Sequence, residues 1–237
     1  MIQDGDFIKL TYTGRIGDEN GDVFDTTDEE VARENDIFHE DYTYGGEKII
    51  VGAGHALKGL EEEVIGKEVG HSGTVVLPPE KGFGEYDPGL IRSYGLSQFK
   101  EKPEVGMRVF VEGRYGTVRR LIGRRVQVDF NHPLAGKTLH YTYQIEEKID
   151  DELEKVRGLV QLYTKEVLET RIDGDEAIIN IPLRLAHSST WIMSKQNLAE
   201  DIIKHTEVNE VVFTERYNEE SIASFRASFR SSQELPR

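Results

Sequence analysis

Alternating apolar and polar positions predict strands over much of the first half of the chain. The run at 7–14, Phe-Ile-Lys-Leu-Thr-Tyr-Thr-Gly, has a period of two and is rich in strand-forming side chains. Shorter runs share this character, at 23–27, 47–52 and 73–77. Residues 56–65 instead carry apolar side chains at helical spacing, namely Leu57, Leu60, Val64 and Ile65. We therefore expect a sheet with one short helix lying across it.

The middle of the chain predicts a small β unit of its own. Three strand-like runs are separated by glycines, at 107–111, 116–122 and 125–130. Leu96–Phe99 resembles a short helical turn. After the third run comes a turn, Asn-His-Pro-Leu-Ala-Gly-Lys at 131–137, and then another alternating run at 138–145. These features indicate a β unit of roughly 40 residues inserted into the first sheet.

The last part of the chain alternates helical and strand patterns in the order helix, strand, strand, helix, strand. The expected bounds are 150–164, 165–171, 177–185, 190–205 and 208–217. The two central strands flank the turn Asp173-Gly174-Asp175. This order favours a separate α+β domain. Residues 218–237 are rich in Ser, Glu and Arg, and we predict a mobile tail there.

Composition excludes several classes of protein. The chain has 237 residues and no cysteine, so disulfides and thiolate metal sites are ruled out. No run approaches the roughly 18 consecutive apolar residues of a membrane helix, and the first residues do not resemble a signal peptide. These absences suggest a cytoplasmic protein with no membrane partner. The net charge of −15 argues against nucleic-acid binding by the chain as a whole.

The charge is unevenly distributed along the chain. Residues 17–47 contain 12 acidic side chains and a single basic one, Arg33. Residues 87–127 contain 9 Lys or Arg and 4 Asp or Glu, so this segment has a surface of its own. Its arginine run, at Arg119, Arg120, Arg124 and Arg125, is either a solvated basic rim or a patch that binds RNA. We favour the rim, because charge runs alone are weak signals.

Motifs for a cofactor, a metal or a nucleophile are incomplete. Gly52-Ala53-Gly54 follows a strand as in a dinucleotide fingerprint, but Leu57 stands where the third glycine belongs. A tight turn before the helix is the better interpretation. No two of the seven histidines have the i,i+4 spacing of a helical metal site, and no nucleophile elbow occurs. We therefore predict no cofactor and no metal.

A set of aromatic and aliphatic residues remains as the candidate site. Its members are Tyr12, Phe24, Leu57, Leu60, Phe83 and Tyr141, with one carboxylate, Asp25, beside Phe24. Such residues usually form core. A partly open sheet wrapped on one short helix would also leave an apolar cleft with few polar groups. The residues alone leave both possibilities open.

Five stretches, taken in order, resemble the FKBP-type peptidyl-prolyl isomerases, in particular the SlyD-like and long archaeal members. They are KLTYTGRI (9–16), GDVFDTT (21–27), VGAGHALKGLEEEVIGKEVG (51–70), VVLPPEKGFGEYDP (75–88) and VDFNHPLAGKTLHYTYQI (128–145). The resemblance implies an α+β fold, with an FKBP-like antiparallel half-barrel sheet wrapped on a short helix. It also implies a small all-β insert-in-flap domain and a C-terminal α+β domain. The expected domains are 1–86 with 128–148, then 87–127 and 149–217, followed by the tail.

The resemblance also implies which residues form the isomerase site. They are Tyr12, Phe24, Asp25, Leu57, Leu60, Phe83, Leu134 and Tyr141. Leu60 takes the place of an aromatic floor residue, and Phe83 replaces a tyrosine that donates a hydrogen bond. Glu47 falls where an apolar wall residue is common. Ala56 is smaller than its usual counterpart.

The activity implied by the resemblance needs neither acid, base nor cofactor. An apolar pocket binds the twisted X-Pro amide better than either planar form, with Asp25 orienting nearby groups. The insert is expected to bind unfolded or partly folded proline-containing chains through Ile91, Tyr94, Leu96, Phe99, Val109 and Phe110. For each of these six residues a place in the core of the insert is the alternative. The resemblance further implies a homodimer formed through the C-terminal domain. The rival function is a peptide-binding module without catalysis.

Overall fold

The computed structural model describes residues 1–40, 42–219 and 221–223. The chain divides into two units. The first contains residues 1–14, 22–75 and the chain from 141 onward, and the second contains 15–21 and 76–140. Each unit is described by itself.

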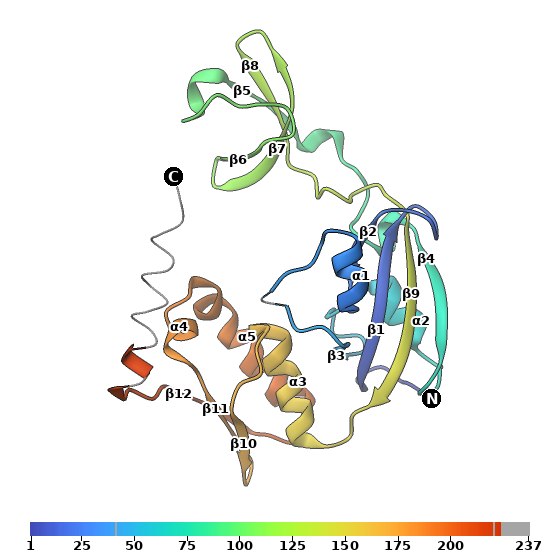
Figure 1. Cartoon of the computed structure of the whole chain (residues 1–237), viewed down its shortest axis with the longest axis vertical. Helices are drawn as coiled ribbons and strands as arrows, with labels where there is room; N and C mark the ends of the chain where they lie inside the picture. Colours follow the sequence, from blue (N-terminus) through green and yellow to red (C-terminus); the bar gives the residue numbers. More distant parts are fainter. Residues whose placement is uncertain (41, 220, 224–237) are drawn as a thin grey trace. The chain divides into compact units, whose positions relative to one another are not determined.

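A five-stranded sheet organises the first unit (Figure 1). Its strands are β1 (Phe7–Ile16), β2 (Val23–Thr26), β3 (Glu47–Ile50), β4 (Ser72–Leu77) and β9 (Leu139–Lys148). The order is β2-β1-β9-β4, and β3 pairs antiparallel with β1, with Leu10 opposite Glu47. Along β9, buried Leu139, Tyr141, Tyr143 and Ile145 alternate with more exposed residues, which is the period-two pattern predicted from the sequence.

Two short helices accompany this sheet, α1 (Glu29–Glu34) and α2 (Lys58–Val64). Asp28 caps α1, because its carboxylate accepts the N–H groups of Glu30 and Val31. Helix α2 is shorter than the predicted 56–65. Its buried residues include Leu60 and Val64. Ile65, expected on the same apolar face, is 44% exposed because the helix ends before it.

The second unit contains a four-stranded antiparallel sheet with the order β5-β8-β7-β6. Its strands are β5 (Ile91–Gly95), β6 (Arg108–Val111), β7 (Arg114–Ile122) and β8 (Arg125–Asp129), with short 3₁₀ turns η1 (Pro79–Lys81), η2 (Pro88–Leu90) and η3 (Leu96–Gln98). Three strands and the turn at 96–99 were predicted, whereas β5 was not. The arginine, serine and glycine residues of β5 give this segment a low strand propensity. It forms a strand because it pairs with β8.

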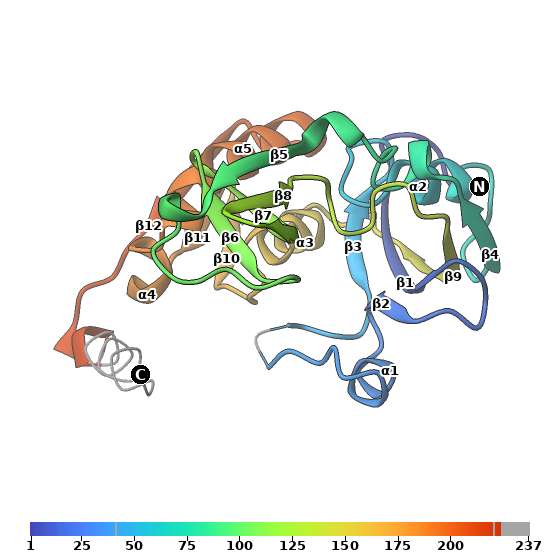
Figure 2. The same cartoon turned by 90° about the horizontal axis from the view of Figure 1, so that it is seen from above.

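The C-terminal part of the first unit has an α+β arrangement, as predicted. Its elements are α3 (Glu152–Thr164), β10 (Thr170–Asp173), β11 (Glu176–Asn180), α4 (Leu183–Ala186), α5 (Ser189–His205) and β12 (Glu210–Thr214). The sheet has the order β10-β11-β12, with β11 and β12 parallel. Figure 2 shows α3 and α5 together beside this sheet.

Two strand predictions in this part were wrong at one end. The strand expected at 165–171 begins only at Thr170, because Lys165 still caps α3 in a left-handed conformation. The strand expected at 177–185 ends at Asn180, and Pro182 then stands as the N-cap residue just before α4. Proline lacks an N–H for a sheet ladder, and its fixed φ suits the start of a helix.

The C-terminal part shares its hydrophobic core with the first sheet. Phe7 of β1 and Ile50 of β3 belong to the same buried cluster as Val156 and Leu159 of α3. Gly158 permits this approach, since a Cβ there would lie 2.9 Å from Lys48 Cβ. The segment predicted as a separate domain therefore packs directly on the sheet that carries the candidate site.

Two further sequence predictions concern the membrane and the tail. Within residues 1–40, 42–219 and 221–223, no helix is long and apolar enough to cross a membrane. Most of the tail predicted at 218–237 lies outside the described residues, which include 218, 219 and 221–223. Where it is described, the Asn218 side chain accepts the N–H of Ser221, so the chain turns at this point.

Candidate active site

Three aromatic rings predicted for the site meet on the first sheet. Tyr12 comes from β1, Phe24 from β2 and Tyr141 from β9. The ring centres of Tyr12 and Tyr141 are 5.6 Å apart, and those of Phe24 and Tyr141 are 5.8 Å apart in an edge-to-face arrangement. Tyr141 is 2% exposed, whereas Tyr12 and Phe24 are half-buried. The rings thus form an apolar wall with Tyr141 at its back.

Gly14 provides the space that these rings occupy. It lies two residues after Tyr12 on β1, so any side chain there would project from the same face. A Cβ at Gly14 would lie 2.8 Å from Phe24 Cζ and 2.9 Å from Tyr141 Cζ. The glycine of the Tyr-Thr-Gly motif is therefore explained by close packing, and sequence reasoning assigned it no role.

Phe24 and Asp25 line a cleft of about 300 Å³. Its other wall is the loop after α1, with Asp36, Ile37, His39, Tyr42 and Tyr44. Within this loop Phe38 stacks on Tyr44, with ring centres 5.5 Å apart. Sequence reasoning described this segment only as acidic. The signal it overlooked was the presence of three aromatic residues, Phe38, Tyr42 and Tyr44, in an otherwise polar run.

Polar groups beside the ring wall come from the Tyr12 hydroxyl and two carboxylates, Asp25, which lines the cleft, and Glu47. The Tyr12 hydroxyl donates a hydrogen bond to Glu47 Oε2 at 3.1 Å. Burial, followed by the nearby charge of Glu47, raises the pKa of Asp25 to about 6. A hydrogen bond from Tyr12 and the positive charge of Lys165 act in the opposite direction on that pKa. Burial and the same two carboxylates raise the pKa of Tyr12 and of Tyr141 well above the usual value. Both phenols therefore stay protonated, and Tyr12 remains a hydrogen-bond donor.

The helix residues Leu57 and Leu60 have different environments. Leu60 is 1% exposed and belongs to the core, while Leu57 is half-buried at the start of α2. The turn that precedes α2 is held by Glu61, which is 5% exposed. Its carboxylate accepts the N–H groups of Gly52, Gly54 and Ala56 at 3.0, 3.1 and 2.8 Å. The glycine-rich turn thus binds an internal carboxylate, which agrees with its interpretation as a structural turn.

Phe83 and Leu134 belong to the second unit. Phe83 is half-buried and stacks on His132, with ring centres 4.2 Å apart. Leu134 is half-buried in the turn at 131–137, where its N–H donates to His132 Nδ1 at 3.2 Å. Their part in the site stays a prediction.

Asn131, the first residue of the turn at 131–137, has a defined structural role. Its amide oxygen accepts the N–H of Asp87 at 2.9 Å, and its amide nitrogen donates to the Asp87 carbonyl at 2.9 Å. Asp87 and Asn131 lie just outside the two ends of the four-stranded sheet. One side chain therefore ties together the two segments that enter and leave the insert.

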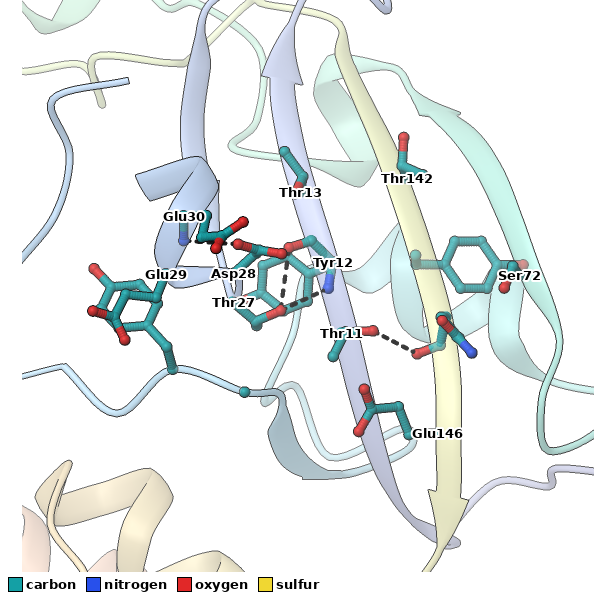
Figure 3. Close-up of a pocket in the computed structure, with 14 residues that line it drawn as sticks. Thr11, Tyr12, Thr13, Thr27, Asp28, Glu29, Glu30, Ser72, Thr142 and Glu146 are labelled. Carbon is teal, nitrogen blue, oxygen red and sulfur yellow. Dashed lines mark hydrogen bonds between the residues drawn. The ribbon is translucent and has the colours of Figure 1, made fainter. Parts of the chain in front are cut away.

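A larger cleft, of about 690 Å³, lies on the opposite face of the first sheet (Figure 3). Thr11, Thr13 and Thr142 project into it, and α2 lies behind the sheet in this view. Thr27 at its edge accepts the Tyr12 N–H at 2.9 Å. Its lining combines the hydroxyl and carboxyl groups of residues such as Thr11, Asp28 and Glu146 with the tyrosines Tyr12, Tyr44 and Tyr143.

The six residues predicted to bind unfolded chains divide into three groups. Tyr94 and Val109, 6% and 8% exposed, belong to the core of the insert, so their assignment to a binding surface was wrong. Ile91 and Phe99 are half-buried. Leu96 and Phe110 are exposed by 38% and 61%. Alternation along β6 separates these roles, because Val109 and Val111 point inward and Phe110 points outward.

Sequence reasoning missed other exposed apolar residues of the insert. Tyr115 is 61% exposed and lies opposite Phe110 in the β6–β7 register, with ring centres 4.8 Å apart. Leu121 and Ile122, near the end of β7, are 40% and 51% exposed. The signal was present, since a period of two along β7 places apolar residues on both faces.

The four arginines of the predicted basic patch are exposed. Arg119 donates to the Tyr86 hydroxyl at 2.6 Å, and Arg125 donates to Ser93 Oγ at 3.0 Å. Two of the four therefore have partners within the second unit, which favours the solvated rim over an RNA patch. Across the part of the chain that the structure describes, no group of three or more potential metal ligands is found.

Sequence models of three protein families match the chain. The FKBP-type peptidyl-prolyl cis-trans isomerase model matches residues 1–95. The models described as FKBP26, IF domain and FKBP26_C-terminal match 96–134 and 152–218. The short-type peptidyl-prolyl cis-trans isomerase of Methanocaldococcus jannaschii is 39% identical over 148 residues, which cover 61% of this chain and 92% of that protein. The chain belongs to the FKBP-type peptidyl-prolyl cis-trans isomerases.

Other FKBP-type relatives agree with this assignment. The SlyD protein of Treponema pallidum is 33% identical over 156 residues, covering 62% of this chain and 79% of that protein. The FKBP-type 16 kDa isomerase of Escherichia coli is 36% identical over 104 residues, covering 41% and 69%. The predicted resemblance to SlyD-like FKBPs with an insert is therefore confirmed.

Proposed function

We propose that this FKBP-type enzyme accelerates rotation about X-Pro bonds in polypeptides at the cleft beside Phe24 and Asp25. The observation that carries the proposal is the wall of Tyr12, Phe24 and Tyr141, for which Gly14 leaves the space. Such a wall offers an apolar surface to a prolyl ring. Only a few carboxyl and hydroxyl groups lie beside the wall. They suit orientation of a bound peptide rather than proton transfer.

The reaction follows from the physics of the amide bond. Rotation faces a barrier of about 18–20 kcal/mol, because the twisted amide loses its resonance. The twisted form has less charge separation than either planar form, so water stabilises the planar forms more than the twisted one. Beside a dry apolar wall this difference is smaller. Binding of the substrate residues on either side of the prolyl bond lowers the barrier only where the enzyme binds the twisted form more tightly than the planar forms. Tyr12 remains a donor and Asp25 orients neighbouring groups.

We also propose the domain limits 1–86 with 128–148 for the isomerase part, 87–127 for the insert and 149–217 for the C-terminal part. Matches of separate family models to 1–95, 96–134 and 152–218 support this division. Pairing of β5 with β8, from Ile91 opposite Asp129 to Gly95 opposite Arg125, supports an insert closed at its base.

The insert is proposed to bind unfolded proline-containing chains, and thereby to help folding. Its exposed apolar residues support this proposal, namely Leu96, Met107, Phe110, Tyr115, Leu121 and Ile122. A weak chain-binding surface linked to the isomerase part raises the local concentration of substrate at the cleft.

Replacing Phe110 and Tyr115 together by serine tests both parts of the function. In a protease-free assay, we expect isomerisation of a short proline peptide to be unchanged, because the cleft is intact. Catalysis of proline-limited refolding of a whole protein should fall about tenfold, because capture of the chain is weakened. Val69→Ser, which removes an exposed apolar side chain outside the insert, is the matched control.

The outcomes separate the competing functions. Equal refolding catalysis by the double variant and the Val69→Ser control would contradict the chaperone role of this surface. Tight binding of the short peptide by the original chain with no acceleration of its isomerisation would instead favour the non-catalytic module.

Homodimerisation through the C-terminal part is a further proposal. It is supported by exposed apolar side chains on α5, where Ile192 and Met193 are 57% and 80% exposed. We expect sedimentation to give twice the chain mass at micromolar concentration. A single-chain mass at all concentrations would contradict it.

A further inference from the structure

Lys165 contacts the segment that leads into β3 through both its backbone and its side chain. It ends α3 in a left-handed conformation, with φ of 59°. Its carbonyl accepts a hydrogen bond from the Thr43 hydroxyl at 3.3 Å. Its ammonium lies 3.4 Å from Glu47 Oε1 and 5.4 Å from the ring centre of Tyr42. The end of α3 is thus joined to residues 42–47, of which Tyr42 and Tyr44 line the cleft.

Glu47 connects this contact to Tyr12. One of its oxygens, Oε1, pairs with Lys165, and the other, Oε2, accepts the Tyr12 hydroxyl at 3.1 Å. The Glu47 side chain is only 21% exposed, so water competes weakly for either oxygen. Because the carboxylate is planar, holding one oxygen also fixes the direction in which the other accepts. The orientation of the Tyr12 hydroxyl therefore depends on Lys165.

Packing as well as charge holds α3 in this position. The shared core includes Ile50 of β3, and Gly158 lets the helix approach Lys48 closely. Lys48 also pairs with Glu154 of α3 at 2.7 Å. The contact made by Lys165 thus extends an interface that is apolar at its centre.

We propose that Lys165 is a positioning residue of the isomerase site, through which the C-terminal part holds Glu47 and, with it, the hydroxyl of Tyr12. The inference rests on the proposed assignment of the cleft beside Phe24 and Asp25 as the isomerase site. Lys165 acts through Glu47 and does not touch the substrate. The C-terminal part is then a component of the catalytic unit as well as a neighbour of it.

Asp25 provides a readout that a purely structural role would leave unchanged. Titratable and charged groups face it from every side, namely Tyr12 on β1, Glu47 on β3, Tyr141 on β9, Lys165 after α3, and Asp36 and His39 in the loop after α1. A peptide bound over the cleft removes water from the Asp25 carboxyl and favours its neutral form. We therefore expect kcat/KM to be higher at low pH and to fall as the pH rises through about 6, the pKa of Asp25.

The effect of Lys165 on this profile has a definite sign. Its positive charge stabilises the ionised form of Asp25 and so lowers the pKa of that carboxyl. Removing the charge raises the pKa, which moves the inflection of kcat/KM to higher pH. Loss of the contact to Glu47 has a separate effect on kcat/KM. It frees the Tyr12 hydroxyl even at low pH, where Asp25 is already neutral.

The experiment measures kcat/KM for a short proline peptide from about pH 5 to pH 8 with the full chain and its Lys165→Met variant. At about pH 5 we expect a fall of about fivefold, the size typical of one hydrogen bond, because the Tyr12 hydroxyl loses its fixed orientation. The inflection should move upward by about half a pH unit, the size typical of a partly exposed charge pair. Lys165→Arg, which retains the charge, should restore both features.

Three further variants make the result decisive. Asp25→Asn should abolish the inflection, which assigns it to Asp25. Lys195→Met removes an exposed lysine from α5 and is the matched control. If Lys165→Met folds poorly, Lys165→Asn replaces it, since asparagine tolerates the left-handed conformation. A Lys165→Met profile identical to that of Lys195→Met would overturn the inference, as would an equal fall at every pH with the inflection unmoved. Absence of isomerase activity in the unaltered chain would instead refute the proposed function.

Discussion

Gly14→Ala is expected to reduce kcat/KM for a proline peptide on the order of a hundredfold, because the rings proposed to form the isomerase site must be displaced. The added Cβ would lie 2.8 Å from Phe24 and 2.9 Å from Tyr141, well inside contact distance. Tyr141 is 2% exposed and has little room to retreat, so Phe24 should turn away from the sheet. A protease-free isomerisation assay measures the loss.

Gly95→Ala is the matched control for this prediction. A Cβ at Gly95 would find the Ser97 hydroxyl at 3.7 Å, an ordinary contact, and the residue lies in the insert. We expect its peptide isomerisation to equal that of the unaltered chain. Unchanged kcat/KM for Gly14→Ala in a folded protein would show that the three rings do not form the catalytic surface.

Glu61→Leu is expected to lower the free energy of unfolding of the first unit by about 3 kcal/mol or more, since it removes three charge-assisted hydrogen bonds. The Glu61 carboxylate accepts the N–H groups of Gly52, Gly54 and Ala56 and is 5% exposed. Leucine would leave these donors without their partner and would free the turn that places Leu57. Urea unfolding followed by circular dichroism measures the effect.

Two comparisons make the Glu61 prediction specific. Glu62→Leu changes the next residue of α2, which is exposed, and should alter stability by less than about 1 kcal/mol. Glu61→Gln keeps one acceptor oxygen, so its effect should lie between the other two. Equal stability of Glu61→Leu and Glu62→Leu would contradict a structural role for the internal carboxylate.

Local patterns predicted elements wherever neighbouring residues decide the structure. Alternation located β1 and β9, and helical spacing located α3 and α5, because one face of each is buried. Strand β5 was missed because its pairing with β8, more than 30 residues away, gives it its structure. Tyr94 and Phe110 look equally apolar in the sequence, and only the sheet decides that one is buried and the other exposed.

The candidate site shows the same division. Tyr12, Phe24, Asp25 and Tyr141 were predicted by resemblance, and the structure places them around one wall and its adjoining cleft. The role of Gly14 was not predicted, because the rings that require it come from other strands. The aromatic loop after α1 was overlooked because an irregular segment has no periodicity to reveal which side chains face inward.

Local spacing and motifs in the sequence were enough to predict the family, the order of most strands and helices, and the residue types of the proposed isomerase site. The contact of Glu47 with both Tyr12 and Lys165, which lies 118 residues after Glu47, could not be predicted from local patterns. Glu47 appeared to be a departure from the family pattern, a charge in place of an apolar wall residue. Its partners explain that charge. A carboxylate that is largely shielded from water is stabilised by donors and cations around it, and folding alone brings such distant groups together.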